Sequence, residues 1–358
     1  MKCKILFLLP SLRAGGAEKV ISFVAGRLDR NYFIPKLLVL GYEKDTVYDT
    51  GMLDITYLNR TRLLSAIPSI LSVMIAEKPD IVMGSISHVN ILLGIFSILF
   101  RKTVFIGREA SVFSVMNRYA GGRAGIYERL LRRSYRRLSA IVCQSGDIRN
   151  DLREVLNIEP ARLVVINNPL TGRSGYEKKG TDYRRIKFVT VGRLSREKGY
   201  LRLLRSLSGI DAFDFSYTII GSGPQKEEIL AEIEELGLQG KVRLTPFSDD
   251  ILWELSRHDY YLQGSYVEGF PNALLESCSA GTPFIAFDCP GGTRKIYLEG
   301  VNGYLAGSQE EFTRILNDRE KLKKLNNPDR VRESVLSRFD GDKILGEYQS
   351  LFRTLFSA

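Results

Sequence analysis

Short apolar runs alternate with longer segments of helical periodicity along the first half of the chain. Amphipathic stretches such as residues 17–28 (AEKVISFVAGRL) separate the apolar runs. The runs occupy residues 3–9, 33–40, 79–85, 103–107, 140–145 and 163–167. Continuous apolar strands separated by helices are typical of a parallel sheet that is covered on both faces.

The alternation stops once. Residues 171–185 contain three glycines and many charged residues in place of aliphatic ones. It then resumes with apolar runs at residues 186–192, 215–221, 241–247, 259–265 and 282–288. A length of 358 residues also favours two domains over one. The pattern therefore predicts an α/β protein with two doubly wound, Rossmann-like domains facing a central cleft, at residues 1–170 and 186–339, joined by a linker at 171–185.

The last segment, residues 340–358, has the apolar spacing of an amphipathic helix. Its stripe consists of Ile344, Leu345, Tyr348, Leu351, Phe352 and Leu355. We expect this helix to join the N-terminal domain. The preceding Asp340-Gly341-Asp342 could be a metal-binding carboxylate pair, but an Asp beside a Gly ahead of a helix favours a turn and helix cap.

The composition narrows the range of partners. Lysine and arginine exceed aspartate and glutamate by 51 − 41, a net charge of +10, which indicates an anionic partner such as a nucleotide, a membrane surface or a nucleic acid. The four cysteines (Cys3, Cys143, Cys278, Cys289) lack metal-like spacing and are interpreted as reduced core residues of a cytoplasmic protein. The most apolar window, residues 89–100, is shorter than the ~20 residues of a membrane span and favours a buried helix, with an interfacial one as the alternative.

Ligands of open α/β sheets bind at the carboxyl ends of the strands, so the loops that follow the strands hold the candidate chemistry. Gly15 and Gly16 follow the first strand and precede a helix expected from Ala17, where paired glycines let a backbone approach an anion. Gly221 and Gly223 form a similar turn, with Pro224 near the first helical position. The third glycine of a dinucleotide fingerprint is missing there, which argues against a hydride-transfer domain.

Two cations follow another strand. Arg193 and Lys198 come after Gly192 in VTVGRLSREKG. A planar guanidinium and a mobile ammonium together suit a diphosphate, although solvated surface charge is the alternative.

Residues 265–292 contain two carboxylates around a Gly-Phe-Pro-Asn turn. Pro271 can start a helix because it has no N–H to satisfy, and the amides of Asn272, Ala273 and Leu274 would then point at an anion. Glu276 lies within that helix and leans back toward the same ligand, where a carboxylate accepts hydrogen bonds from a ribose diol. Glu268 lies on the turn, where a sugar attached to the diphosphate would be.

The motifs VGRLSREKG, GSGP and EGFPNALLE, followed by AGTPFIAFDCPGG, resemble family 4 of the retaining, nucleotide-sugar-dependent glycosyltransferases of the GT-B fold. The resemblance implies that Arg193 and Lys198 hold the donor diphosphate, that Glu276 binds the ribose and that Glu268 binds the transferred sugar. Backbone groups assist at Gly192, Gly221, Gly223, Phe270, Pro271, Asn272, Ala273 and Leu274, and Gly15 and Gly16 approach from the other domain. Retention by same-face attack needs no protein nucleophile, no metal and no cofactor.

The chain departs from this family in one place. Many relatives carry a His after the strand that here reads TVFIGREAS, where this chain has Arg108 and Glu109. The two residues contact sugar or acceptor, or they form a structural ion pair.

Arginines are concentrated between Arg118 and Arg137, where there are seven arginines and one acid, Glu128. On a helical wheel the apolar side consists of Ile126, Tyr127, Leu130, Leu131 and Leu138, and the basic side of Arg129, Arg132, Arg133 and Arg136. This basic side suits anionic lipid or a lipid-linked diphosphate, with a solvated face as the alternative. Nucleic acid is disfavoured because no aromatic residues are interleaved for stacking.

These features predict a peripheral enzyme on the cytoplasmic face of the cell membrane. It would move a hexose or N-acetylhexosamine from a nucleotide-diphosphate sugar to a glycan acceptor on a polyprenyl diphosphate, with retention, in the synthesis of cell-surface polysaccharide. Two alternatives remain open: a nucleotide-sugar epimerase of the same fold, and a non-catalytic basic protein that binds membrane or polymer.

Overall fold

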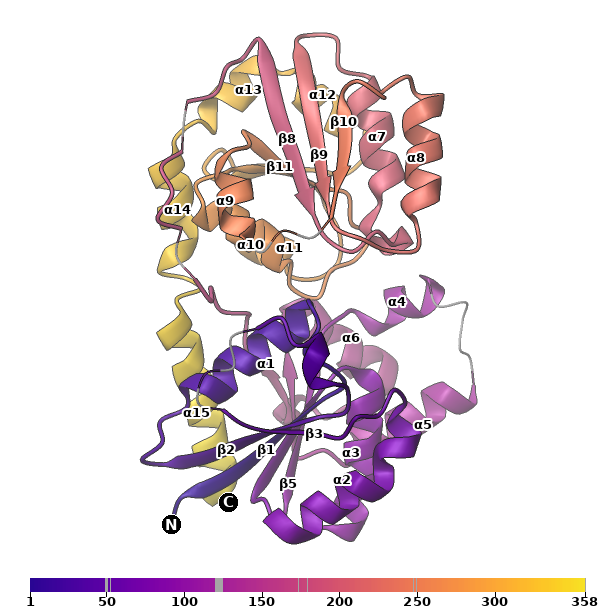
Figure 1. Cartoon of the computed structure of the whole chain (residues 1–358), viewed down its shortest axis with the longest axis vertical. Helices are drawn as coiled ribbons and strands as arrows, with labels where there is room; N and C mark the ends of the chain where they lie inside the picture. Colours follow the sequence, from indigo (N-terminus) through magenta and orange to yellow (C-terminus); the bar gives the residue numbers. More distant parts are fainter. Residues whose placement is uncertain are drawn as a thin grey trace. The chain divides into compact units, whose positions relative to one another are not determined.

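The computed structural model describes residues 1–48, 51, 53–119, 125–172, 174–178, 180–246, 248 and 250–357. The chain divides into two compact units. The first unit consists of Met1–Thr171 with Gly341–Ala358, and the second consists of Gly172–Asp340 (Figure 1).

The first unit is built on a seven-stranded parallel sheet with the order β3-β2-β1-β4-β5-β6-β7. Its strands are β1 (Cys3–Leu9), β2 (Phe33–Val39), β3 (Asp54–Tyr57), β4 (Ile81–Ser85), β5 (Val104–Glu109), β6 (Ala140–Cys143) and β7 (Leu163–Val165). Its helices are α1 (Gly16–Arg27), η1 (Glu43–Asp45), α2 (Leu63–Glu77), α3 (Ser87–Leu99), α4 (Phe113–Tyr119), α5 (Ile126–Tyr135), α6 (Gly146–Leu156), η2 (Pro160–Arg162) and α15 (Gly341–Ser357).

The helices of the first unit cover both faces of the sheet. Alternate residues of β1, such as Ile5 and Phe7, pack in one core with α1 and α15. Helices α2, α3 and α5 lie on the opposite face, because right-handed crossovers in the direction β3 to β4 to β5 to β6 all fall on one side (Figure 1). A Cβ atom at Gly94 of α3 would collide with the Ser134 carbonyl of α5, so glycine permits the close approach of these two helices.

The second unit has a six-stranded parallel sheet with the order β10-β9-β8-β11-β12-β13. Its strands are β8 (Arg185–Val191), β9 (Asp214–Ile220), β10 (Val242–Thr245), β11 (Tyr260–Gln263), β12 (Phe284–Phe287) and β13 (Gly303–Ala306). Its helices are η3 (Arg196–Lys198), α7 (Tyr200–Ser208), α8 (Lys226–Glu235), α9 (Ile251–Ser256), α10 (Asn272–Ser279), α11 (Thr293–Ile296), α12 (Gln309–Asn317), α13 (Arg319–Lys324) and α14 (Pro328–Leu336).

Two parallel, helix-covered sheets confirm the fold class predicted from the alternating pattern. The pattern missed β3 and β13, two strands at sheet edges whose sequences, DITY and GYLA, begin with a charged residue and a glycine and so lack a continuous apolar run. All four cysteines are buried thiols.

Helix α15 returns the chain to the first unit. Its stripe buries Ile344, Leu345, Tyr348 and Phe352 in the first unit's core, and the Phe352 ring lies edge-on to the ring of Phe7 at a centroid distance of 6.1 Å. Asp342 at its start lies 4.0 Å from Arg27.

The segment expected to be a linker is not a simple tether. Beyond Thr171 its residues belong to the second unit, and residues 173 and 179 lie outside the described part. The Lys178 ammonium donates to the His258 carbonyl at 2.5 Å and to the Thr282 hydroxyl at 2.6 Å. Burial lowers the pKa of Lys178 to about 7. This side chain therefore anchors the segment to the body of the second unit.

Candidate functional site

The candidate donor site lies at the carboxyl ends of the parallel strands of the second unit, where the loops after β8, β9, β11 and β12 meet. An ion pair joins two of these loops: the Lys198 ammonium lies 2.7 Å from Glu268 Oε1. The Ser265 hydroxyl donates to the same carboxylate oxygen at 2.5 Å. Burial lowers the pKa of the Lys198 ammonium, but the charge and hydrogen bond of Glu268 outweigh it and hold that pKa above its usual range. Lys198 is therefore a permanent cation at neutral pH.

Glycines bring these loops into backbone contact. Gly199, with φ of 64°, packs against the Gly264 carbonyl, and Gly291, with φ of 126°, packs against the Glu268 carbonyl. A Cβ atom at either position would collide with that carbonyl, and a positive φ disfavours other residues there. The Glu268 amide also donates to the Pro290 carbonyl at 3.0 Å. These contacts fix the distance between Lys198 and Glu268, and the sequence reasoning missed them.

Arg202 of α7 is a further residue that the sequence reasoning missed. Its guanidinium lies over the rings of Tyr266 and Phe287, at 3.8 and 3.9 Å from their centroids. It donates to the carbonyls of Gly264 and Ser265. Arg202 therefore holds the loop after β11 through its backbone carbonyls. The sequence feature that could have indicated this residue is its position four residues after Lys198 in a basic segment.

Helix α10 begins directly after this loop. The sequence predicted Pro271 as its first residue, whereas the structure begins the helix at Asn272 and makes Pro271 the N-cap, with φ −79° and ψ 89°. The Leu275 amide closes the first turn by donating to the Pro271 carbonyl at 3.0 Å. The first amides of a helix point away from its carbonyls, toward the space ahead of the helix. Leu274 is buried and Ala273 is half-buried.

Two further predicted residues flank this helix start. Phe270 is buried, and its ring packs edge-on against the ring of Phe339 at a centroid distance of 5.4 Å. Glu276 lies one turn into α10 and is half-buried.

The remaining donor residues lie on the two neighbouring loops. Arg193 is exposed after β8, two residues beyond the strand end. A Cβ at Gly221 would collide with the Gly192 carbonyl, and a Cβ at Gly223 with the Leu194 carbonyl. These glycines thus let the loops after β8 and β9 touch each other. Helix α8 begins at Lys226, two residues later than the prediction for Pro224.

In the first unit, the backbone amide and carbonyl of Gly15 are hydrogen-bonded within the unit. The Gly15 amide donates to the Tyr48 hydroxyl at 2.6 Å, and that hydroxyl donates to the Gly15 carbonyl at 2.7 Å. The Glu18 carboxylate leans back over Gly15 at the start of α1, and burial raises its pKa. The Gly15 amide and carbonyl are therefore both engaged by Tyr48, and the expected approach of Gly15 and Gly16 to a donor diphosphate stays a prediction. Gly16 is the first residue of α1.

Arg108 and Glu109 point to opposite faces of the first sheet, as neighbouring strand residues do. The completely buried Arg108 guanidinium donates to Tyr348 at 3.2 Å, to Ser85 at 3.3 Å and to Asn168 at 2.6 Å. The ion-pair interpretation is therefore wrong, because the two side chains bind different partners. Arg108 ties β5 to α15 and to the segment after β7.

Glu109 belongs to a buried polar cluster under α3 and α5. Its carboxylate accepts hydrogen bonds from the Tyr135 hydroxyl at 2.5 Å, from Ser87 at 3.2 Å and from the Ala110 amide at 3.1 Å. Burial nevertheless raises the pKa of Glu109.

The raised pKa of Glu109 makes the stability of the first unit depend on pH. The folded state binds this proton more tightly than the unfolded state does, so the stabilising contribution is full at low pH and is lost as the pH rises through the folded pKa. We expect the Glu109→Gln variant to gain stability relative to the parent between about pH 5 and pH 8, by at most about 1.4 kcal/mol for each pH unit. Urea unfolding at both pH values measures the effect. The exposed Glu154→Gln should show no such trend, and an equal trend in both variants would contradict the expectation.

The arginine-rich helix is rotated relative to the predicted wheel. Leu131, Ser134 and Tyr135 of α5 are buried together with Leu138, whereas Ile126 and Leu130 of the predicted apolar side are exposed. Two of the four arginines of the predicted basic side also make bonds within the unit. Arg132 donates to the Val155 carbonyl at 2.9 Å, and Arg136 donates to the Asn157 carbonyl at 3.3 Å. Arg129 and Arg133 are exposed, and Arg123 lies outside the described residues.

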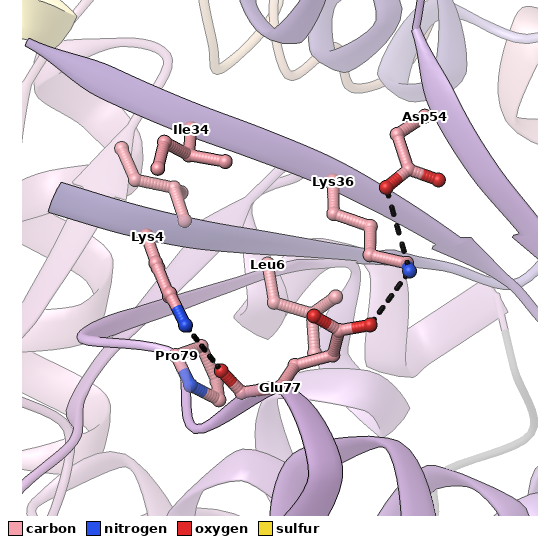
Figure 2. A pocket seen from close by; sticks show the side chains of 8 residues that line it. Lys4, Leu6, Ile34, Lys36, Asp54, Glu77 and Pro79 are labelled. Carbon is pink, nitrogen blue, oxygen red and sulfur yellow. Dashed lines mark hydrogen bonds and ion pairs between the residues drawn. The ribbon is translucent and has the colours of Figure 1, made fainter. Parts of the chain in front are cut away.

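A small cavity lies at the edge of the first sheet where the strands begin. Its volume is about 60 Å³, and Figure 2 shows Lys36 pointing between two acids in its wall. The Lys36 ammonium lies 2.7 Å from Glu77 and 3.4 Å from Asp54. Because this cation is already neutralised and the cavity lies away from the strand ends where ligands bind, we do not assign a site there.

The described residues contain no group of three or more His, Cys, Asp or Glu side chains that could hold a metal ion. Within the same residues, no helix is both long and apolar enough to cross a bilayer.

Two family profiles divide the chain between them. Residues 14–171 match the profile described as Glycosyltransferase Family 4. Residues 176–332, which hold Lys198, Glu268 and α10, match the profile described as Glycosyl transferases group 1. The chain belongs to the family 4 glycosyltransferases. This membership confirms the resemblance drawn from the motifs and disfavours the non-catalytic alternative.

Curated relatives are similar over parts of the chain. An N-acetylgalactosamine-N,N'-diacetylbacillosaminyl-diphospho-undecaprenol 4-alpha-N-acetylgalactosaminyltransferase from Campylobacter jejuni is 26% identical over 239 residues, which is 66% of this chain and 64% of the relative. The amylovoran biosynthesis glycosyltransferase AmsD from Erwinia amylovora is 30% identical over 131 residues, which is 36% of this chain and 37% of the relative. The chain therefore aligns with less than two thirds of either relative's length.

Solved structures match the whole fold. Anabaena HepE in complex with UDP-glucose superimposes with a TM-score of 0.80 at 19% identity, over 98% of this chain and 99% of that one. The apo form of the lipopolysaccharide outer core galactosyltransferase WaaB gives a TM-score of 0.74 at 19% identity, over 98% and 99% of the two chains. At this identity the likeness shows that the fold is shared with glycosyltransferases.

Proposed function

We propose that this glycosyltransferase moves a hexose or N-acetylhexosamine from a nucleotide-diphosphate sugar to a glycan acceptor on a polyprenyl diphosphate, with retention, in cell-surface polysaccharide synthesis. The observation that carries the proposal is the Lys198–Glu268 pair beside the start of α10, within the region that matches group 1. The Campylobacter relative's name describes a diphospho-undecaprenol acceptor, and HepE of similar fold was solved with UDP-glucose. Both are consistent with the proposed substrates.

The site residues have distinct roles in this proposal. Lys198 and Arg193 bind the donor diphosphate and stabilise the charge that develops on it as the sugar leaves. The first amides of α10 add the positive end of a helix, and Gly192, Gly221 and Gly223 keep the loops close to the ligand. Glu276 binds the ribose. Glu268 releases part of its hold on Lys198 when the diphosphate arrives, and it orients the transferred sugar.

The chemistry itself needs little from the protein beyond position and charge. The acceptor hydroxyl attacks the anomeric carbon on the face that the diphosphate leaves, and the departing phosphate oxygen takes the hydroxyl proton. The bond from the anomeric carbon to the phosphate oxygen breaks as the new glycosidic bond forms. The protein holds the acceptor hydroxyl beside the departing phosphate oxygen on one face of the sugar, and it neutralises the leaving group.

Metal independence follows from this assignment. Because Lys198, Arg193 and a helix start supply the positive charge, we expect turnover in excess chelator to stay within about twofold of the untreated rate. Initial rates with and without EDTA measure it. A complete loss that added Mg²⁺ or Mn²⁺ restores would contradict the proposed charge balance.

Product analysis tests the function as a whole. The purified chain is incubated with a panel of nucleotide sugars and a polyprenyl-diphosphate glycan acceptor, and the lipid fraction is examined by mass spectrometry and NMR. We expect one sugar to be added with the anomeric configuration of its donor. Conversion of a donor without any acceptor product would instead support the epimerase, and an inverted linkage would contradict retention.

The predicted membrane role of the basic helix is part of this proposal. Arg129 and Arg133, exposed on α5, are proposed to contact anionic headgroups, each contributing about 1 kcal/mol. The guanidinium groups of Arg132 and Arg136 already donate hydrogen bonds to backbone carbonyls of the unit, so their contribution to lipid binding is smaller.

A further inference from the structure

The outward sides of α2 and α3 lack charged residues. Residues 63–76 and 87–100 contain no Asp, Glu, Lys or Arg. A surface helix of a globular protein ordinarily carries charged or polar residues opposite its buried stripe. These two helices carry only serines and one histidine there (Ser65, Ser72 and His88 are exposed) and no charged residue, although both lie at the surface of the first unit (Figure 1).

Large apolar side chains occupy these outward positions. On α2, Leu64 is 79% exposed and Ile75 is 63% exposed, and on α3, Leu99 is 66% exposed. The exposed apolar residues of α2, α3 and α5 are Leu64, Ile75, Ile95, Ile98, Leu99, Ile126 and Leu130, which we term the apolar helix face.

The three helices form one layer. The chain after α2 bonds to the chain after α3, because the Thr103 hydroxyl donates to the Pro79 carbonyl at 3.0 Å. Helix α3 meets α5 at Gly94 and Ser134, where their backbones come into close contact. The exposed side chains of α2, α3 and α5 therefore belong to one side of the first unit.

Cations surround the apolar helix face. Exposed cations stand at the ends of α2 and α3 and on α5: Arg60, Arg62, Lys78, Arg101, Lys102, Arg129 and Arg133. The acids of these helices and of the chain beside them are engaged: Glu77 pairs with Lys36, Glu128 pairs with Arg132, and Asp80 accepts a hydrogen bond from the Lys4 amide. The rim is thus net positive around an apolar centre.

We propose that the apolar helix face is a monotopic membrane surface, with α2, α3 and α5 lying in the headgroup region of an anionic bilayer. An apolar side flanked by lysine and arginine is the pattern of helices that lie in the interface. A second copy of this chain fits less well, because a symmetric dimer through this face would place like cationic rims against each other. The proposal deepens the proposed function, on which its biological meaning rests.

The orientation suits a lipid-linked acceptor. In a doubly wound sheet the crossover helices run antiparallel to the strands, so the starts of α2, α3 and α5 lie at the carboxyl edge where ligands bind. If the helices lie flat on the bilayer, that edge of the first unit is held at the level of the headgroups. A diphosphate on a membrane-embedded polyprenyl chain is found at the same level.

Vesicle sedimentation separates the apolar contribution from the electrostatic one. The purified chain is mixed with phosphatidylcholine/phosphatidylglycerol vesicles at about 0.1 M and about 1 M salt, where the Debye length falls from about 10 to about 3 Å. We expect binding to weaken but to persist at high salt. The Leu64→Glu/Ile75→Glu double variant should lose at least about tenfold of the salt-resistant partition. The Arg129→Gln/Arg133→Gln variant should lose mainly the salt-sensitive part.

A matched control is available in the second unit, where Leu230 is an exposed leucine on α8. Leu230→Glu should bind vesicles as the parent does. Circular dichroism and thermal unfolding should be unchanged in all of these variants, because each side chain is exposed.

Three outcomes would overturn the proposal. The double variant could sediment like the parent at high salt, Leu230→Glu could lose as much binding, or the parent could be a dimer that the double variant splits in analytical ultracentrifugation. Nucleoside diphosphate affinity and transfer to a water-soluble acceptor should be unchanged in the double variant. Absence of any transfer by the parent would instead sink the proposed function and leave the vesicle result standing.

Discussion

Replacing Lys198 by alanine is expected to lower turnover by about two orders of magnitude or more. The substitution removes a cation that stabilises the negative charge developing on the leaving diphosphate. Arg193→Ala is expected to have an effect of the same kind. Initial rates with a water-soluble acceptor measure both. Arg196→Ala is the matched control, since Arg196 lies on the same loop, is exposed and points to Glu228 at 3.9 Å. It should retain the parent rate.

Folding must be checked separately in the Lys198 variant, because the substitution leaves the buried Glu268 carboxylate without its cationic partner. We expect thermal unfolding to change little, since Ser265 and the Pro290 carbonyl still hold that loop. Near-native rates in both Lys198→Ala and Arg193→Ala would remove the diphosphate assignment.

The second large effect concerns stability. Arg108→Met is expected to lower the free energy of unfolding of the first unit by about 3 kcal/mol or more, because three buried oxygens lose a charged donor at once. Amide hydrogen exchange in α15 should become faster, because Arg108 holds this helix through Tyr348. Urea unfolding and amide hydrogen exchange of α15 measure these two consequences.

Tyr348→Phe serves as the comparison for Arg108→Met. It removes one of the three bonds, so a loss of about 1 kcal/mol is expected. Equal, small losses in both variants would mean that Arg108 does not tie these segments together.

The sheets could be predicted because their strands are continuous apolar runs. Strands β3 and β13 were missed because their sequences, DITY and GYLA, interrupt the apolar run with an aspartate, a threonine or a glycine. The start of α10 was placed one residue early, since Pro271 is compatible with both the cap and the first position. Helix ends are set by one or two hydrogen bonds, which the pattern of residue types does not resolve.

Two further errors of the sequence analysis could have been avoided from the residue pattern itself. Arg108 and Glu109 are consecutive in a strand, so the alternation of side chains already placed them on opposite faces. The wheel of α5 counted Ile126 and Leu130 as core, whereas the buried residues Leu131, Ser134, Tyr135 and Leu138 follow the spacing i, i+3, i+4, i+7. Because two of these buried residues, Ser134 and Tyr135, are polar, the pattern of apolar residues alone did not show which side of α5 is buried.

The donor loops show a limit of a different kind. Lys198 and Glu268 were singled out by residue type, but their direct ion pair joins positions seventy residues apart. The contacts that hold them, Gly199 on Gly264 and Gly291 on Glu268, are backbone to backbone. Glycines in loops are compatible with many conformations, so such contacts cannot be assigned from sequence spacing.

Calorimetric titration with UDP, GDP, ADP and dTDP in excess chelator tests the central claim most directly, namely that the Lys198–Glu268 loops bind a nucleoside diphosphate. The account predicts saturable binding of at least one of these ligands to the parent, and binding weakened at least about tenfold in Lys198→Ala while Arg196→Ala matches the parent. No binding to the parent, or equal affinity in the parent and in Lys198→Ala, would contradict it.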